Sequence, residues 1–315
     1  MINLFIRRIM RIAFVHTGQS FMPEVNAYID YFSSKNVDCI VIPPGKLNNL
    51  KTDVEWFFMG VDYSPARKNV LRIHEYTSAS TPPAAGLKDF VKRLTVTAPD
   101  YRVFLNDFVR KRLGFSDSVA FGFRDMGVPN SWLTSFQPLP VKEYDFIYIG
   151  DTSAQRKIDR LLRPFTKGDL QSKKIAIIGH RYEKLKQQFE SYSNIFFNGP
   201  LTHEEVRQHI LRSKYALNFI PDIAPFNQQT STKFLEYAVN KTPVITSAYH
   251  WIRKFQRNYG GNYYYLNSDL SNLNWDAISN FEYSFPDMKE WTWEDQINRS
   301  GVIKFLQSKF PGILL

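Results

Sequence analysis

The chain has 315 residues, of which 43% are hydrophobic and 22% charged, a composition typical of a folded soluble protein rather than a disordered one. No apolar stretch approaches the roughly 20 residues of a membrane-spanning helix, and a single cysteine, Cys39, excludes an intramolecular disulfide framework and clustered-thiol zinc sites. Forty basic against thirty acidic residues give a net charge of +10, which indicates a polyanionic partner: a nucleic acid, a phosphorylated ligand or an anionic lipid.

The first half alternates between strand-like and helix-like stretches. The run RIAFVHT at 11–17 predicts a strand. PEVNAYIDYFSSK at 23–35 predicts a helix, because proline occupies a helix-start position and apolar residues recur at helical spacing. The same patterns predict strands at 37–44, 56–60, 69–76 and 102–106, a loop at 78–86 and a basic helix at 107–115.

The second half repeats this alternation after a proline-bearing polar connection at 136–144, which predicts a domain boundary near residue 140. Strands are predicted at 145–149, 174–178, 194–197, 215–220 and 243–246, and helices at 156–165, 182–192, 202–212 and 233–240. Such alternation predicts α/β layers around parallel sheets, so we expect two Rossmann-like, doubly wound domains over 1–140 and 141–290. Their ligands are expected outside the carboxyl ends of the strands.

The most informative run is FNQQTSTKFLEYAVNKTPVITS at 226–247. Three hydroxyl residues supply an N-cap and side-chain donors at a predicted helix start, where free backbone N–H groups form an anion site: Thr230, Ser231 and Thr232. Lys233 begins the helix, and Glu236 lies on the same face by its three-residue spacing. A carboxylate repels phosphates, so its expected ligand is a pair of neutral hydroxyls such as those of a ribose. A capped surface helix with a Lys233–Glu236 ion pair is the alternative interpretation.

This segment resembles the nucleotide-sugar site of GT-B glycosyltransferases, especially the retaining group that includes glycosyltransferase family 4, where a helix of the form KxxEYxxxxxPVI follows a polar loop. Glu236 matches the second glutamate of the group's E-x(7)-E motif, whereas Gln228 stands at the first. The resemblance implies two Rossmann-like domains that face each other across a cleft (GT-B) and a nucleotide-diphosphate sugar as donor. The neutral Gln228 leaves the sugar, and the choice between retention and inversion, open.

Other residues at predicted strand ends agree with this resemblance. Those expected to bind the nucleotide sugar are Gly18 in the first half and Gly150, Ser153, Arg156, Arg181 and Gly199 in the second. Turn glycines and solvated helix faces are the alternative interpretation. TWEDQ at 292–296 resembles the segment that begins the last helix of the family, so residues 291–315 are expected to pack back towards the first domain.

The resemblance implies that the first domain holds the acceptor and the group that handles its proton. His74 and Glu24 are predicted as catalytic residues, with a capping or hydrogen-bonded structural role as the alternative for each. The sequence has no HExxH or CxxC motif and no DxD motif in a convincing loop, so no metal and no cofactor is expected besides the donor substrate.

The sequence therefore predicts a metal-independent glycosyltransferase that moves a sugar from a nucleotide-diphosphate donor to a glycan or lipid-linked acceptor, as in bacterial-type surface polysaccharide synthesis. A sugar-nucleotide epimerase of the same architecture is the first alternative. A basic nucleic-acid-binding protein is the second, although neither an RNA-recognition nor a helix-turn-helix signature occurs, so no nucleic-acid partner is expected.

A cytoplasmic location is expected, since a single cysteine fits a reducing compartment. The opening segment MINLFIRRIM at 1–10 is either an upstream extension or a short amphipathic segment that touches a membrane. Together with the basic helix at 107–115 it is expected to hold the first domain peripherally against an anionic membrane surface, with a solvated basic face as the alternative.

Overall fold

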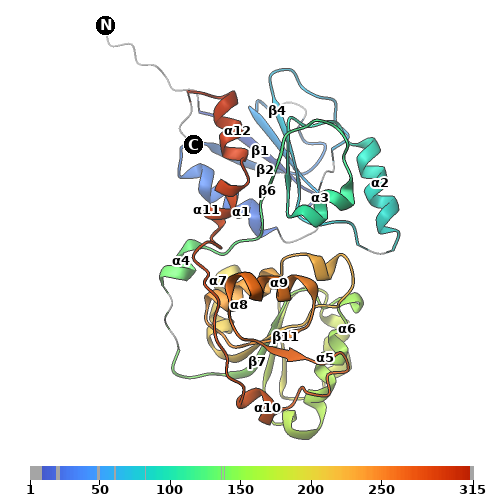
Figure 1. Ribbon diagram of the computed structural model, residues 1–315, viewed down its shortest axis with the longest axis vertical. Coiled ribbons are helices and arrows are strands. Elements are labelled where there is room, and N and C mark those ends of the chain that lie inside the picture. Colours follow the sequence, from blue (N-terminus) through green and yellow to red (C-terminus); the bar gives the residue numbers. More distant parts are fainter. Residues whose placement is uncertain are drawn as a thin grey trace. The chain divides into compact units, whose positions relative to one another are not determined.

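The computed structural model describes residues 9–18, 22–47, 50–59, 62–81, 83–135, 137 and 139–312. The chain forms two compact units (Figure 1). Unit 1 comprises Met1–Gly127 and Trp293–Leu315, and unit 2 comprises Val128–Thr292. The membrane-touching segment predicted at 1–10 lies, except for its last two residues, outside the described part. Within that part, no helix is long and apolar enough to cross a membrane.

The division between the units falls after Gly127, earlier in the chain than the predicted boundary near residue 140. The reason is helix α4 (Asn130–Thr134), which packs on unit 2. Its buried Trp132 lies against the imidazole of His203, with 4.5 Å between the ring centres. Because the indole of Trp132 is buried against unit 2, the segment that leads from Gly127 to the first strand of unit 2 belongs to unit 2.

Unit 1 contains a six-stranded parallel sheet in the order β2-β1-β3-β4-β5-β6. Parallel strands are covered on both faces, which explains why every residue of the central strands β3 and β5 is buried. The strand positions predicted for the first half are confirmed, and β6 is an additional short edge strand. The strands are β1 (Arg11–Val15), β2 (Asp38–Ile42), β3 (Val54–Phe58), β4 (Leu71–Tyr76), β5 (Tyr101–Phe104) and β6 (Phe121–Phe123).

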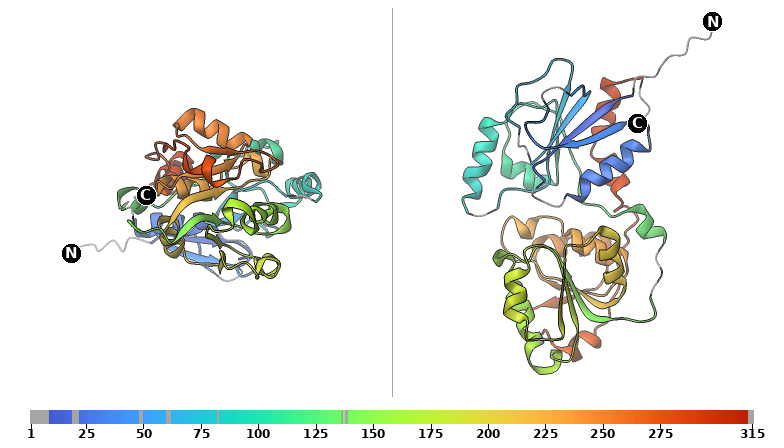
Figure 2. Two further views of the ribbon diagram at one scale, coloured as in Figure 1. Left: turned by 90° about the horizontal axis from the view of Figure 1, so that it is seen from below. Right: turned by 180° about the vertical axis from the view of Figure 1, so that it is seen from behind.

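Helices cover both faces of this sheet (Figures 1 and 2). Tyr101 on β5 stacks on Phe305 at 4.8 Å between ring centres, whereas its neighbour Arg102 lies over the ring of Phe115 at 4.0 Å. Successive side chains of a strand point to opposite faces, so the C-terminal helix and the segment after residue 107 lie on opposite sides. The helices are α1 (Pro23–Ser33), α2 (Ala85–Thr95), α3 (Asp107–Leu113), α11 (Trp293–Arg299) and α12 (Val302–Lys309).

Unit 2 contains a second six-stranded parallel sheet, in the order β12-β11-β10-β7-β8-β9. The strand order reverses between β7 and β10, because β7 comes first in the unit and its two neighbours are the second and fourth strands. The predicted fold class, with two Rossmann-like parallel sheets, is confirmed. The strands are β7 (Tyr144–Ile149), β8 (Ile175–Ile178), β9 (Ile195–Gly199), β10 (Ser213–Asn218), β11 (Val244–Ser247) and β12 (Tyr264–Leu266).

The four helices predicted in unit 2 are present, the first of them shortened, whereas the helices at 130–134, 250–259 and 275–279 were not predicted. The helix predicted at 156–165 is reduced to a single turn and a half, because Lys157 has a left-handed backbone (φ 54°) before it and Pro164 lies in the 3-10 turn after it. The helices are α5 (Ile158–Leu162), α6 (Glu183–Phe189), α7 (His203–Leu211), α8 (Thr232–Val239), α9 (His250–Tyr259) and α10 (Trp275–Ser279).

Candidate functional site

Two glycines bring the loops after β7 and β8 into backbone contact at the carboxyl edge of the unit 2 sheet. Gly150 and Gly179 have φ values of 125° and 157°. A Cβ atom on Gly179 would lie 1.9 Å from the carbonyl oxygen of Gly150, so no side chain fits there. In open parallel sheets, ligands bind outside the carboxyl ends of the strands where the strand order reverses. Gly150 directly follows β7, one of the two strands at that point.

Helix α8 begins at the same edge, directly after the loop from β10. Ser231 is its N-cap: the hydroxyl accepts a hydrogen bond from the backbone N–H of Phe234 and donates one to Oδ1 of the buried Asn218, at 2.7 Å. The amide of Asn218 donates in turn to Tyr249, at 3.0 Å. Because its hydroxyl already has partners, Ser231 fixes the helix start rather than offering a free donor. Thr230 and Thr232 on either side of it are half-buried.

Lys233 lies in the first turn of α8 and points back to the end of β7. Its ammonium is 4.1 Å from the ring centre of Tyr148 and 3.3 Å from the place where a Cβ of Gly150 would stand. Burial, and then the charge of Arg156, lowers the pKa of Lys233 well below its ordinary value. Two cations in a partly desolvated place are stabilised by a bound anion.

Arg156 approaches this position from the loop after β7. Its guanidinium lies 4.2 Å from the ring centre of Phe226, and its Nε is 3.9 Å from Oδ2 of Asp151. Asp151 also accepts hydrogen bonds from the backbone N–H and the hydroxyl of Ser153, at 3.0 Å and 2.7 Å. The charge of Arg156 thus acts on Lys233 and lowers its pKa, whereas the side chain of Ser153 is engaged with Asp151.

Glu236 lies one turn along α8 and is only 5% exposed. Its Oε1 is 2.9 Å from Nε2 of His203, the first residue of α7. Within the described chain, no hydrogen bond to the second carboxylate oxygen is formed, so Oε2 is the atom that a ligand hydroxyl would reach. The ion pair considered for Lys233 and Glu236 is replaced by this contact with His203.

No protein-family model and no curated protein matches this sequence. Solved structures do resemble it. AviGT4, a glycosyltransferase involved in avilamycin A biosynthesis, superimposes with a TM-score of 0.57 over 96% of this chain and 98% of its own, at 12% identity. A T4 phage BGT variant in complex with UDP-glucose gives 0.53 over 97% and 100%, at 14% identity. A putative UDP-N-acetylglucosamine 2-epimerase from Listeria monocytogenes gives 0.52 over 96% and 97%, at 9% identity.

The chain has the GT-B glycosyltransferase fold. At these identities the similarity concerns the fold and leaves the chemistry to the residues of the site.

His74 was predicted as a catalytic residue, but it is a core residue of unit 1. It has no exposed surface. Its Nε2 is 2.9 Å from Oδ2 of Asp62 and its Nδ1 is 3.3 Å from the hydroxyl of Tyr76. Burial lowers the pKa of His74 although Asp62 acts in the opposite direction. A side chain enclosed in this way cannot touch an acceptor, so the prediction is corrected: the alternation of β4 places His74 on a face that helices cover.

Glu24, the second predicted catalytic residue, is 3% exposed and belongs to a buried charge cluster of unit 1. Its Oε1 is 3.9 Å from Arg124, whose Nε donates to Glu75 at 2.7 Å. Glu75 also accepts a hydrogen bond from the indole of Trp56, at 2.9 Å. Burial is the largest cause that raises the pKa of Glu24. The observed surroundings of Glu24 thus correspond to the structural alternative.

Three further residues predicted to bind the nucleotide sugar are Gly18, Arg181 and Gly199. Gly18 follows β1 in unit 1, where it has a φ of 72° and its N–H donates to Nδ1 of His16. Arg181 follows β8 and is exposed. Gly199 ends the edge strand β9 with a φ of 64°, and a Cβ there would lie 3.3 Å from the ring of Tyr182. Its lack of a side chain is explained by this packing.

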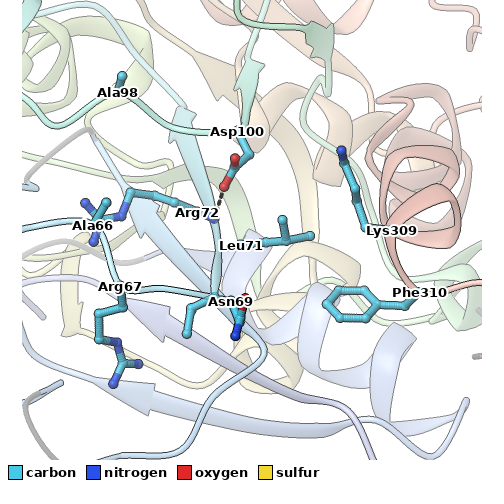
Figure 3. A pocket seen from close by; sticks show the side chains of 10 residues that line it. Ala66, Arg67, Asn69, Leu71, Arg72, Ala98, Asp100, Lys309 and Phe310 are labelled. Atoms are coloured by element: carbon cyan, nitrogen blue, oxygen red, sulfur yellow. Dashed lines mark hydrogen bonds between the residues drawn. The ribbon is translucent and has the colours of Figure 1, made fainter.

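A cavity of about 440 Å³ lies elsewhere, at the amino end of β4 in unit 1 (Figure 3). It is lined by Leu71, Asp100 and Phe310 among others, and the Asp100 carboxylate accepts a hydrogen bond from the backbone N–H of Arg72 at 2.8 Å. This is the wrong end of the strands for a ligand of a parallel sheet. No group of three or more histidine, cysteine or acidic side chains that could hold a metal occurs among the described residues.

Proposed function

We propose that this protein is a glycosyltransferase that transfers a sugar from a nucleotide-diphosphate donor to a glycan or lipid-linked acceptor. One observation carries the proposal. Lys233, partly desolvated and under the charge of Arg156, lies in the first turn of α8 beside the end of β7, where the strand order of the unit 2 sheet reverses. A diphosphate matches this arrangement in charge and in hydrogen-bond acceptors.

The chemistry assigned to these cations is stabilisation of the leaving group. As the bond between the sugar and the donor breaks, negative charge accumulates on the terminal phosphate oxygens. Lys233, Arg156 and the α8 N-terminus are held in place before reaction, so they stabilise this charge without reorganisation. We propose that these groups take the role that a divalent metal has in other transferases, and that the reaction is metal-independent.

Glu236 is proposed to bind the ribose of the donor. A nearly buried carboxylate is a strong acceptor for hydroxyl groups. The contact between Oε1 and His203 fixes the orientation of the carboxylate and therefore the position of Oε2. The distance of one helical turn between Lys233 and Glu236 matches the separation of a phosphate and a ribose in the same nucleotide.

A binding experiment tests this proposal. The thermal midpoint Tm should rise with at least one of the diphosphates UDP, GDP and ADP, and less with the monophosphate CMP, because a ligand that binds only the folded state stabilises it. Lys233→Ala should lose that rise, while Lys184→Ala, an exposed lysine on α6, should keep it. If all four nucleotides leave the wild-type Tm unchanged, or if Lys233→Ala responds like wild type, the assignment fails.

An epimerase that acts on a sugar nucleotide is the second candidate, supported by the similarity to the Listeria monocytogenes protein. Both candidates use the same nucleotide site, so binding does not separate them. Incubation of the donor without any acceptor does: an epimerase converts one nucleotide sugar into its epimer, whereas a transferase leaves it intact or hydrolyses it slowly. We favour transfer, and propose surface polysaccharide synthesis at the cytoplasmic side of a membrane as its setting.

A further inference from the structure

Helix α2 exposes its apolar side chains to solvent. The exposed fractions are 64% for Leu87, 47% for Phe90, 43% for Val91 and 66% for Leu94. Their spacing of three and four residues places all four on one face of the helix. Four large apolar residues on one helix face are normally buried against a core, so this face is not explained by the packing of unit 1.

The opposite face of α2 is held by polar contacts. Asp89 is the only buried residue of the helix, and it accepts hydrogen bonds from the backbone N–H of Ser80 and from Nε of Arg112, both at 3.1 Å. Arg93 donates to the backbone oxygen of Gly114 at 3.4 Å. The helix is therefore attached to α3 through its charged side, with the apolar side turned outward.

Cations flank the apolar face. Lys88 and Lys92 lie on one side of it along the helix, and Arg93 lies on the other, with its guanidinium 5.1 Å from the ring centre of Phe90. The neighbouring α3 adds Arg110, Lys111 and Arg112. The acidic residues of the two helices are already paired, since Asp89 binds Arg112 and Asp107 binds Arg110 and Lys111. The charge presented around the apolar face is positive.

A second apolar pair continues this side of unit 1. Phe121 and Phe123 on the edge strand β6 are 46% and 37% exposed. A Cβ on Gly122 between them would lie 1.8 Å from the carbonyl oxygen of Ser300, so Gly122 faces the C-terminal helices and the two phenylalanines face the α3 side. The guanidinium of Arg110 lies 5.1 Å from the ring centre of Phe121, which connects the two apolar groups through α3.

We propose that α2 is an interfacial helix through which unit 1 docks on an anionic lipid surface. The apolar face enters the boundary between headgroups and acyl chains, and the flanking lysines and arginines meet lipid phosphates. The apolar part of this contact lies on α2, which was not among the predicted helices, while Lys88, Lys92 and Arg93 of α2 and the cations of α3 supply the basic rim. The proposal goes beyond the proposed function, because it assigns the face of unit 1 that meets lipid and holds whichever sugar is transferred.

Co-sedimentation with vesicles tests the proposal. The full-length protein should bind vesicles of phosphatidylcholine and phosphatidylglycerol in equal parts and should bind pure phosphatidylcholine far less. The double variant L87Q/L94Q should lower the partition coefficient by about tenfold, since it removes two large apolar side chains from the buried face. The control V141Q/F285Q removes two exposed apolar side chains of unit 2, at 72% and 40% exposure, and should bind like wild type.

Two further measurements keep the test decisive. Hydrogen exchange of the wild-type α2 amides should slow when anionic vesicles are added, a result that does not depend on how any variant folds. Neutralising the rim in K88Q/R93Q should weaken binding at low salt. Equal binding of wild type and L87Q/L94Q overturns the proposal. So does a wild-type dimer in solution that L87Q/L94Q converts to a monomer, because the face would then be a protein interface.

Discussion

The carboxylate of Glu236 is 2.9 Å from the imidazole of His203, which begins a different helix of unit 2. The residue expected to bind a ribose therefore already has one partner inside the protein. A histidine in this position orients the carboxylate, and its own ring is held against Trp132 of α4. The segment that enters unit 2 thus supports the proposed nucleotide site through one aromatic contact.

This contact predicts a measurable coupling. His203→Ala should destabilise the protein by about 1 to 3 kcal/mol, because it leaves a buried carboxylate oxygen without its donor. In a double-mutant cycle with Glu236→Gln, the coupling energy should be about 1 kcal/mol. Urea unfolding of the four proteins measures it. Additive effects of the two changes would contradict a direct hydrogen bond.

The lowered pKa of Lys233 predicts how stability depends on pH. In the unfolded chain the lysine has its ordinary pKa of 10.5, whereas in the folded protein it loses its proton at a lower pH. Between these two pKa values the unfolded state holds one more proton than the folded state, so the free energy of unfolding rises with pH in this window. Below the window Lys233 is charged in both states, and its burial as an ammonium destabilises the folded protein.

Lys233→Met should remove that rise and should make the ligand-free protein more stable than wild type at neutral pH. Urea unfolding from neutral to alkaline pH checks both results, with the exposed Lys184→Met as the control that keeps the wild-type slope. A Lys233→Met protein that is less stable than wild type at neutral pH would show that the ammonium of Lys233 does not destabilise the folded protein.

The close approach of Gly179 to Gly150 predicts a strong effect of a single methyl group. Gly179→Ala should lower the free energy of unfolding by roughly 3 kcal/mol or more, because a Cβ would overlap a backbone oxygen that no side-chain rotation can move. Gly168→Ala has a positive φ of 71° but no atom within 4 Å, so it should cost only about 1 to 2 kcal/mol of backbone strain. Equal losses in thermal or urea unfolding would contradict the steric explanation.

The buried cluster around Arg124 predicts a large effect in unit 1. Arg124→Met should cost about 3 to 5 kcal/mol, because it leaves Glu75 and Glu24 buried without their cation. Adding Glu75→Gln should restore part of the loss, since one uncompensated charge is removed. Urea unfolding compares the single and double variants. A double variant as unstable as the sum of both single changes would argue against this electrostatic origin.

Much of the fold follows from the sequence because its signals are local. Apolar runs such as IAII at 175–178 and helices with a capping residue are recognisable within a few residues, and their alternation already predicts two parallel sheets. Helix α2 was not predicted, although its apolar residues at 87, 90, 91 and 94 recur at helical spacing. It begins inside the loop predicted at 78–86 and has no side-chain N-cap that would mark its start.

The candidate site divides in the same way. The sequence by itself determined the α8 segment, with Lys233 in its first turn, because helix caps and spacing are properties of neighbouring residues. Only the tertiary structure decided that His203 binds Glu236 across 33 positions of sequence, that the charge of Arg156 acts on Lys233, and that His74 is enclosed. Burial and long-range contact depend on which faces of a sheet are covered, and that is settled only when all the strands and helices pack together.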